Sequence, residues 1–279
     1  MTTQPGDKQL SFHGLQSVIE GHEAEAWFAF AASASRQQSN PMGAVALRGT
    51  RVLMTAMTAV NFAGLNRVIG LGVGSPATTD DILEIEEFYG SLNQTRFTID
   101  VAPTIHSDQL ISVLRERGYR QLDQTVVKSW HPLNDVPFPR GGPEVVLLDT
   151  EYKDQWSRLH RRVRQTPRLF GHWFVAGFDD PRFFHWGIVE DGVLLAGAAG
   201  YLSDRLLWCG FSATLPEARG RGFQTLLARE RLRFSQEREC YLAHVENDPD
   251  TSASASIGLH NMKKVGYQVL YERAQFVSS

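Results

Sequence analysis

The spacing of hydrophobic and polar residues predicts strands and helices in alternation along the first half of the chain. Residues 96–101 alternate apolar and polar side chains, which is the period of a half-buried strand. Residues 81–89 instead repeat apolar side chains at helical spacing. Ser107 is expected to cap a further helix, whose apolar stripe covers residues 110–114. This half therefore reads as mixed α and β.

The second half continues the alternation and adds a strong hairpin signal. The turn Glu190-Asp191-Gly192 separates two apolar runs, which is typical of a tight β-hairpin. We expect strands at 144–148, 184–188, 193–198, 206–215 and 241–245, a basic helix at 156–164, another helix at 223–238, and a last helix that ends before Gly266.

Two observations predict a duplicated domain. Residues 131–143 hold four prolines and two adjacent glycines, which stop both helix and central strand and indicate a linker. Each half also ends alike, with a polar helix, a glycine, an aromatic residue and a strand, around Gly118-Tyr119 and Gly266-Tyr267. These glycines lie about one domain length apart.

Composition excludes several classes of protein. The 279 residues are 42% hydrophobic and 21% charged with a net charge of −3, which excludes a disordered chain and a protein that mainly coats nucleic acid. Two cysteines are too few for a disulfide framework, and no His/Cys spacing indicates a metal site. The polar residues 1–14 and the short apolar run at 193–202 predict neither a signal peptide nor a membrane span, so we expect a cytoplasmic protein.

The most informative segment is residues 213–227, where a strand ends and the turn Arg219-Gly220-Arg221-Gly222 opens directly into an amphipathic helix. The first turn of a helix has unpaired N–H groups and the positive end of the helix dipole. Glycines let the backbone approach an oxyanion closely, and the arginines add charged donors. The segment therefore predicts a phosphate site.

This segment resembles the signature of the GNAT family of acyl-CoA-dependent N-acyltransferases, Arg/Gln-x-x-Gly-x-Gly/Ala. The run from Arg219 to Gln224 matches it, except that Gln224 stands where the family has Gly or Ala. The order of elements over residues 144–276 and the ending Asn261-Met-Lys-Lys-Val-Gly-Tyr267 are also similar to the family. The first half resembles the same fold more weakly.

The resemblance implies an α/β (α+β) fold of two GNAT-like domains, each a mixed, mostly antiparallel sheet flanked by helices. Residues 1–135 would be a degenerate domain and residues 136–279 the acetyl-CoA-binding catalytic domain. In the first half the equivalent turn, residues 74–81, has no arginine, and Asp80 and Asp81 would repel a second anion.

By the same resemblance, one set of residues is expected to bind acetyl-CoA, as a co-substrate and without a metal. Pantetheine would lie along the end of the fourth strand, the pyrophosphate at the glycine turn, and the thioester arm near two asparagines. These residues are Ser212, Ala213 and Thr214; Arg219, Gly220, Arg221, Gly222, Phe223, Gln224 and Thr225; and Asn247 and Asn261.

The implied chemistry is direct attack of a neutral amine on the thioester carbonyl, assisted by a base. The strand at 206–214 has no glutamate, so Glu246 and His185 are the candidates for the base by position. Met262 occupies the position where many family members have a tyrosine that acts as the general acid. Tyr201 or water is therefore the candidate acid.

Three functions stay open. The first is an N-acetyltransferase for a small-molecule or peptide amine of unknown identity, and the second is a non-catalytic CoA-binding regulatory or scaffold protein. The third is an aminoacyl transferase that contacts tRNA through the basic run at 158–168. The net acidity favours a solvated helix face for that run, so neither nucleic acid nor membrane is an expected partner. Both a monomer and a homodimer fit the pseudo-repeat.

Overall fold

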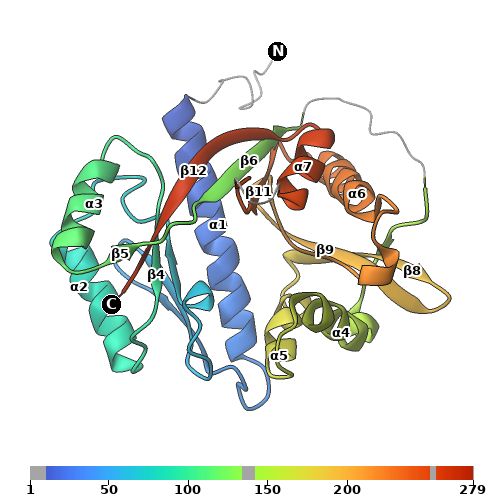
Figure 1. Cartoon of the computed structure of the whole chain (residues 1–279), viewed down its shortest axis with the longest axis horizontal. Coiled ribbons are helices and arrows are strands. Elements are labelled where there is room, and N and C mark those ends of the chain that lie inside the picture. Colours follow the sequence, from blue (N-terminus) through green and yellow to red (C-terminus); the bar gives the residue numbers. More distant parts are fainter. Residues whose placement is uncertain (1–10, 134–141, 252–255, 279) are drawn as a thin grey trace.

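The computed structural model describes residues 11–133, 142–251 and 256–278 (Figure 1). The helices are α1 (Phe12–Ser35), α2 (Thr79–Ser91), α3 (Ser107–Glu116), α4 (Lys153–Arg164), α5 (Phe170–Phe174), α6 (Phe223–Glu237) and α7 (Ile257–Lys264). The strands are β1 (Ala44–Arg48), β2 (Leu53–Met57), β3 (Arg67–Ile69), β4 (Thr98–Val101), β5 (Arg120–Gln121), β6 (Val126–Pro132), β7 (Val146–Leu147), β8 (Phe183–Glu190), β9 (Val193–Ser203), β10 (Leu206–Thr214), β11 (Leu242–Asn247) and β12 (Gln268–Val277). None of these helices is both long and apolar enough to span a bilayer.

The strands join into one sheet in the order β1-β2-β3-β4-β12-β6-β11-β10-β9-β8-β7, with β5 beside β12. Each half contributes one parallel pair, β3 with β4 and β10 with β11, and a helix connects the two strands of each pair. Helices α6 and α7 lie on one side of the second half's strands and α4 and α5 on the other (Figure 1). The predicted α/β fold of two GNAT-like units with mixed sheets is confirmed.

The two halves exchange their last strands. Strand β6 comes from the first half but pairs with β11 of the second, from Val127 opposite Asn247 to Pro132 opposite Leu242. Strand β12 ends the chain but pairs with β4 of the first half. The two exchanged strands also pair with each other and so form the centre of the sheet.

The predicted repeat of helix, glycine, aromatic and strand is confirmed at both places. Gly118 and Gly266 have φ of +87° and +98°, a left-handed conformation that favours glycine after a helix. Ser107 is not the cap that the sequence predicted: it is the first residue of α3, and its hydroxyl donates to the carbonyl of Thr104. His131, expected in the linker, lies in β6, whereas the predicted domain boundary at 135/136 falls outside the described residues.

Helix α1 was not predicted from the sequence, and it is the central support of the sheet. The Ser11 hydroxyl accepts from the amide of Gly14 and caps it. Both halves pack against this helix, so it is buried along most of its length on several faces. A helix covered in this way carries no one-sided apolar stripe, which is why periodicity does not reveal it.

Buried ionic groups fill the seam where α1 crosses the exchanged strands. The guanidinium of Arg273 on β12 lies 3.1 Å from a carboxylate oxygen of Glu20 and 2.7 Å from one of Glu23. Lys128 on β6 also pairs with Glu23, at 2.5 Å. These four side chains are fully buried. Burial alone would raise the pKa of Glu23, but the charges of Arg273 and Lys128 outweigh it and hold that pKa well below its usual range.

A pair of histidines lies beside this cluster. Nδ1 of His22 on α1 is 2.8 Å from Nε2 of His244 on β11, and both rings are buried. Burial lowers the pKa of His22 to about 4 and lowers that of His244 well below its usual value. Both imidazoles are therefore neutral near pH 7.

Acid pH is expected to destabilise the fold through this pair. Because the folded state holds the pKa of His22 below its unfolded value, stability is complete above pH 6.5 and is lost as the pH falls toward 4. For His22 alone the loss is about 3 kcal/mol. Urea unfolding of the wild type and of His22→Leu/His244→Leu between pH 7.5 and 4.5 measures it.

The double variant is expected to show a shallower fall of unfolding free energy with pH. His13→Leu, which replaces an exposed histidine near the start of the same helix, serves as the control and is expected to keep the wild-type slope. An unchanged slope in the double variant contradicts this account.

Candidate functional site

Strands β10 and β11 separate at one end, and this opening is the centre of the candidate site. Their parallel pairing runs from Leu206 opposite Leu242 to Cys209 opposite Val245 and then stops. Strand β10 bulges between Gly210 and Ala213, where its register against β9 shifts, and Phe211 adopts a positive φ of 49°. The bulge turns β10 away from its parallel neighbour and leaves the last residues of β10 unpaired on that side.

The glycine turn follows β10 after a short 3₁₀ helix, Pro216–Ala218, and has the backbone conformation of an anion-binding turn. Gly220 and Gly222 have φ of +78° and +77°, and Gly222 is the N-terminal cap of α6. A Cβ added to either glycine would meet nothing within 4 Å, so the space in front of the turn is open. No acceptor within the described residues takes the backbone amides of residues 220–225. These amides point to a bound anion as their partner.

The two arginines of the turn differ in their contacts. The side chain of Arg219 is exposed and makes no hydrogen bond or ion pair with a described residue. Arg221 pairs with Glu190 of the β8–β9 hairpin at 2.5 Å, and its guanidinium also lies over the ring of Phe223. Exposed ion pairs are worth about 0–1 kcal/mol, so an anion in the turn can take Arg221 from Glu190 at little cost.

Gln224, the residue that departs from the signature, is held against the end of β10. Its Nε2 donates to the carbonyl of Ala213 at 2.9 Å and to Oγ1 of Thr214 at 2.6 Å. The side chain therefore ties the first turn of α6 to β10. The predicted residues Ser212, Ala213 and Thr214 therefore end β10 and Phe223, Gln224 and Thr225 begin α6, with Ala213 and Phe223 buried.

The two asparagines lie on different elements. Asn247 is the last residue of β11, and its Nδ2 is buried without a hydrogen-bond acceptor among the described residues. Asn261 is half-buried on α7, and its side chain makes no hydrogen bond with the described residues. Asn247 thus sits at the opening, with a donor to offer a ligand.

Glu246 lies at the opening, and two guanidiniums contact its carboxylate. Arg67 of β3 reaches it at 3.0 Å, and Arg273 of β12 forms a second, shorter contact. Its side chain is 23% exposed. The predicted base is therefore positioned by a residue from the first half, and its oxygens are already occupied by donors.

The other candidates for proton transfer lie apart from the opening. Tyr201 is opposite Trp208, where β10 and β11 are still paired, and its ring packs on His22 and Phe183. His185 is stacked on Phe178, and burial lowers its pKa to about 3.

One hydroxyl beside the opening was missed by sequence reasoning. The phenol of Tyr267 lies 3.4 Å from Sγ of Cys209, the last residue of β10 that pairs with β11. Burial raises the pKa of Tyr267 well above its usual value, so the hydroxyl stays protonated. Met262, at the position where many GNAT proteins have a tyrosine as general acid, is buried. Nothing in the spacing of the sequence distinguishes Tyr267 from an ordinary core aromatic.

The equivalent turn of the first half is closed by the chain itself. Thr78 and Asp81 form a capping box at the start of α2, so this helix already has a carboxylate at its N-terminus. The guanidinium of Arg51 donates to the carbonyl of Pro76 at 2.8 Å and lies 3.4 Å from the Asp81 carboxylate. An arginine is thus present after all, but it comes from the β1–β2 turn and partners Asp81.

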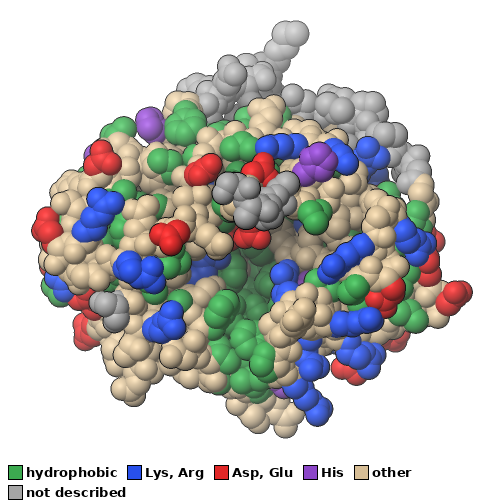
Figure 2. Space-filling model, in the orientation of Figure 1, with side chains coloured by type: hydrophobic (Ala, Val, Ile, Leu, Met, Phe, Trp, Pro, Cys, Tyr) green, Lys and Arg blue, Asp and Glu red, His purple; other side chains and the backbone are tan. Residues whose placement is uncertain are grey.

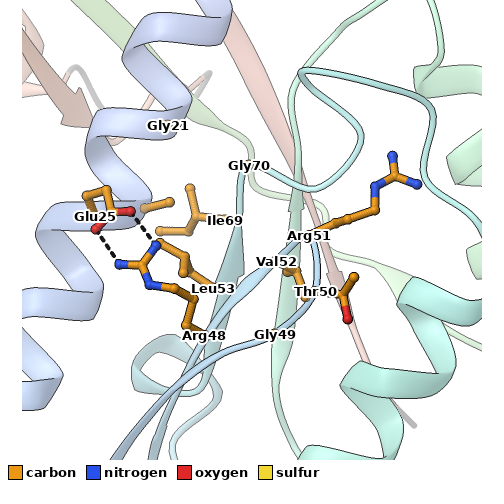
Figure 3. Close-up of a pocket in the computed structure, with 11 residues that line it drawn as sticks. Gly21, Glu25, Arg48, Gly49, Thr50, Arg51, Val52, Leu53, Ile69 and Gly70 are labelled. Carbon is orange, nitrogen blue, oxygen red and sulfur yellow. Dashed lines mark hydrogen bonds and ion pairs between the residues drawn. The ribbon is translucent and has the colours of Figure 1, made fainter.

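A cavity of about 290 Å³ adjoins this turn between α1 and the strands of the first half (Figure 3). Glu25 and Arg48 face one another across part of it in a bidentate pair with distances of 2.7 and 2.9 Å. Arg51 points away from that pair, toward α2 (Figure 3). The charged groups that line the cavity are therefore paired within the chain.

A hollow lies between the two halves in the middle of the face shown in Figure 2, and hydrophobic side chains line it. Aromatic side chains from both halves meet along this junction: the rings of Phe62 and Phe170 are 6.4 Å apart. The guanidinium of Arg67 lies over the half-buried indole of Trp27, at 4.7 Å. Arg67 thus connects the junction to Glu246.

Comparison with known proteins agrees with this geometry. Residues 146–267 match the model of the acetyltransferase (GNAT) family. Those residues hold the separated strands, the glycine turn and the helix that follows it. Residues 146–267 form a GNAT acetyltransferase domain.

Three solved structures share the GNAT fold over most of the chain. A tandem GNAT protein from the clavulanic acid biosynthesis pathway has a TM-score of 0.60 and 16% identity, over 93% of this chain and 95% of that one. A GCN5-related N-acetyltransferase from Kribbella flavida has a TM-score of 0.59 and 17% identity, over 89% and 95%. A GCN5-related N-acetyltransferase from Sphaerobacter thermophilus has a TM-score of 0.56 and 14% identity, over 82% and 80%.

At these identities the likeness establishes the fold alone, and it extends the GNAT architecture to the first half. No curated protein matched the sequence. The predicted family and the predicted tandem arrangement are confirmed. The assignment of individual GNAT residues to acetyl-CoA and to catalysis stays a prediction.

Removal of Arg67 is expected to destabilise the GNAT fold strongly. Arg67 is 5% exposed and pairs with buried Asp100 at 2.5 Å as well as with Glu246. Arg67→Ala would remove one of the two guanidiniums that pair with each carboxylate and leave the negative charge of this cluster only partly compensated, at a cost of about 3–5 kcal/mol. Chemical denaturation at pH 7.5 measures the change in unfolding free energy.

Arg48→Ala is the matched control, because it removes an exposed bidentate pair. That change is expected to cost about 0–1 kcal/mol. Equal losses in the two variants would show that the position of Arg67 has no special importance.

Proposed function

We propose that the chain is an acetyl-CoA-dependent N-acetyltransferase that moves an acetyl group to an amine by direct attack in a ternary complex. The observation that carries this proposal is the glycine turn, with free amides in open space directly after a strand that has separated from its parallel neighbour. Membership of residues 146–267 in the GNAT family supports the same chemistry.

Acetyl-CoA would supply an activated thioester, and the residues present fit such a molecule. The amides of residues 220–225 and the side chains of Arg219 and Arg221 would bind the pyrophosphate. Ser212, Ala213 and Thr214 offer backbone groups on the unpaired side of β10, and Asn247 offers a buried donor at the opening. Asn261, on α7, is the more distant candidate.

The residues that would act as general base and general acid are less directly indicated than those that would bind acetyl-CoA. Glu246 accepts the proton of the attacking amine only if that amine displaces Arg67 or Arg273 from its carboxylate. Tyr201 would need a water to reach the leaving thiolate, because it lies beside the paired part of β10. We therefore add Tyr267 as a candidate acid, since its hydroxyl is protonated and lies beside Cys209 at the opening.

A non-catalytic CoA-binding protein is the second candidate. The occupied carboxylate of Glu246 and the buried Met262 favour it, because both remove ordinary means of proton transfer. In either case we propose that residues 1–135 are a degenerate GNAT domain and that residues 136–279 bind the cofactor.

Calorimetric titration with acetyl-CoA tests the proposal. The wild type is expected to bind, and Arg219→Glu/Arg221→Glu is expected to lose binding, because two negative charges would then face the pyrophosphate in place of two positive ones. Arg96→Glu/Arg120→Glu makes the same change in charge at exposed positions of the first half and is expected to bind like the wild type.

A screen of amines for release of free CoA then separates the two candidates. Turnover with any amine supports the enzyme, whereas binding without turnover supports the regulatory or scaffold protein. A wild type that does not bind acetyl-CoA would refute both.

A further inference from the structure

Arg164 lies at the opening of β10 and β11 without the carboxylate that arginines in such surroundings usually have. It is the last residue of α4, and its Nη2 lies 3.4 Å from the carbonyl oxygen of Ser212, on the bulged part of β10. The next residue, Gln165, turns the chain away with a φ of +52°. The guanidinium therefore projects from α4 across the end of β10.

The contacts of Arg164 leave most of its donors unused. No carboxylate among the described residues lies within ion-pair distance of it, although Arg162 on the same helix pairs with Glu217 at 2.7 Å. The surrounding protein lowers the pKa of Arg164, and Asp248, just after β11, opposes that shift only from a distance. Arg164 thus lies beside the bulged end of β10, exposed to solvent and with one long hydrogen bond.

The side chains around Arg164 form an aromatic wall with unsatisfied polar atoms. Its guanidinium lies 6.0 Å from the ring centre of Phe174, which also stacks on His160, one helical turn earlier on α4. His160 is fully buried, and neither ring nitrogen has a partner among the described residues. Phe211 at the bulge faces the same histidine, at 6.3 Å.

We propose that Arg164 binds a carboxylate carried by one of the two reacting molecules at the opening. A guanidinium offers donors in a fork that matches a carboxylate, and only one donor of Arg164 has an acceptor among the described residues. The inference rests on the proposed function and narrows it to substrates that carry an acidic group beside the reacting atoms.

The position of Arg164 separates this role from phosphate binding. The phosphate cradle begins beyond Thr214, at the start of α6, whereas Arg164 contacts Ser212 at the bulge. The carboxylate has two possible sources, the amine acceptor or a dicarboxylic acyl group on CoA. Both would bring the same group to the same guanidinium.

Matched substrates and three variants of the full chain test the proposal. Phenylalanine is compared with 2-phenylethylamine, and lysine with cadaverine, using acetyl-CoA. Succinyl-CoA is compared with acetyl-CoA on the amines that lack a carboxylate. The variants are Arg164→Gln, Arg164→Lys and Arg158→Gln, the last changing an exposed arginine of the same helix that forms no ion pair with the described residues.

The wild type is expected to prefer the carboxylate-bearing member of one comparison. Arg164→Gln is expected to raise the KM for that member about 10- to 100-fold, as loss of a charged hydrogen bond implies, with little change for its partner. Arg164→Lys should restore part of the preference, and Arg158→Gln should keep all of it. A preference among acceptors identifies the amine as the source, and a preference for succinyl-CoA identifies the acyl group.

Calorimetry on CoA-saturated protein measures carboxylate binding even without turnover. The ligands are the same acceptors, and succinate represents the dicarboxylic acyl group. Equal affinity for both members of every comparison in the wild type, or an unaltered preference in Arg164→Gln, overturns the role of Arg164. Intact acetyl-CoA binding in that experiment leaves the proposed function standing, whereas loss of acetyl-CoA binding by the wild type refutes the proposed function itself.

Discussion

The buried ion pairs of Arg273 are the constraint on which the rest of the molecule depends. This guanidinium comes from the last strand and lies between two glutamates of the first helix, so it joins the two ends of the chain. Charges buried this deeply are tolerated only with partners in good geometry. The pairs therefore fix α1 across the centre of the sheet, and through Arg273 and Glu246 they also fix the end of β11, where the opening begins.

The first half contributes to the second half's site although its own turn is closed. Asp81 and Arg51 satisfy the start of α2 from within the chain. This half also places Arg67 against Glu246, and the ring of Phe62 lies near that of Phe170 of the second half at the junction. The first half thus contributes side chains to its neighbour's site.

Short sequence patterns predicted the elements whose conformation is set by residues close together in the chain. The β8–β9 hairpin, the glycine turn at Gly220 and Gly222 and the amphipathic helix after it follow from turn chemistry and periodicity, and the GNAT motif gave them their order. Helix α1 did not follow, because burial on several faces removes its stripe. The strand exchange, the closure by Arg51 and the place of Arg164 are contacts between distant segments, and no spacing along the sequence encodes them.

The exchange of strands also orders the events by which the chain folds. Strand β4 receives this neighbour only when β12 has been made, so the sheet of the first half stays open at that edge until then. Unpaired edges favour association with other chains. The first half is therefore made before the second but completes its sheet only with β12, a strand that follows the whole second-half sheet along the chain.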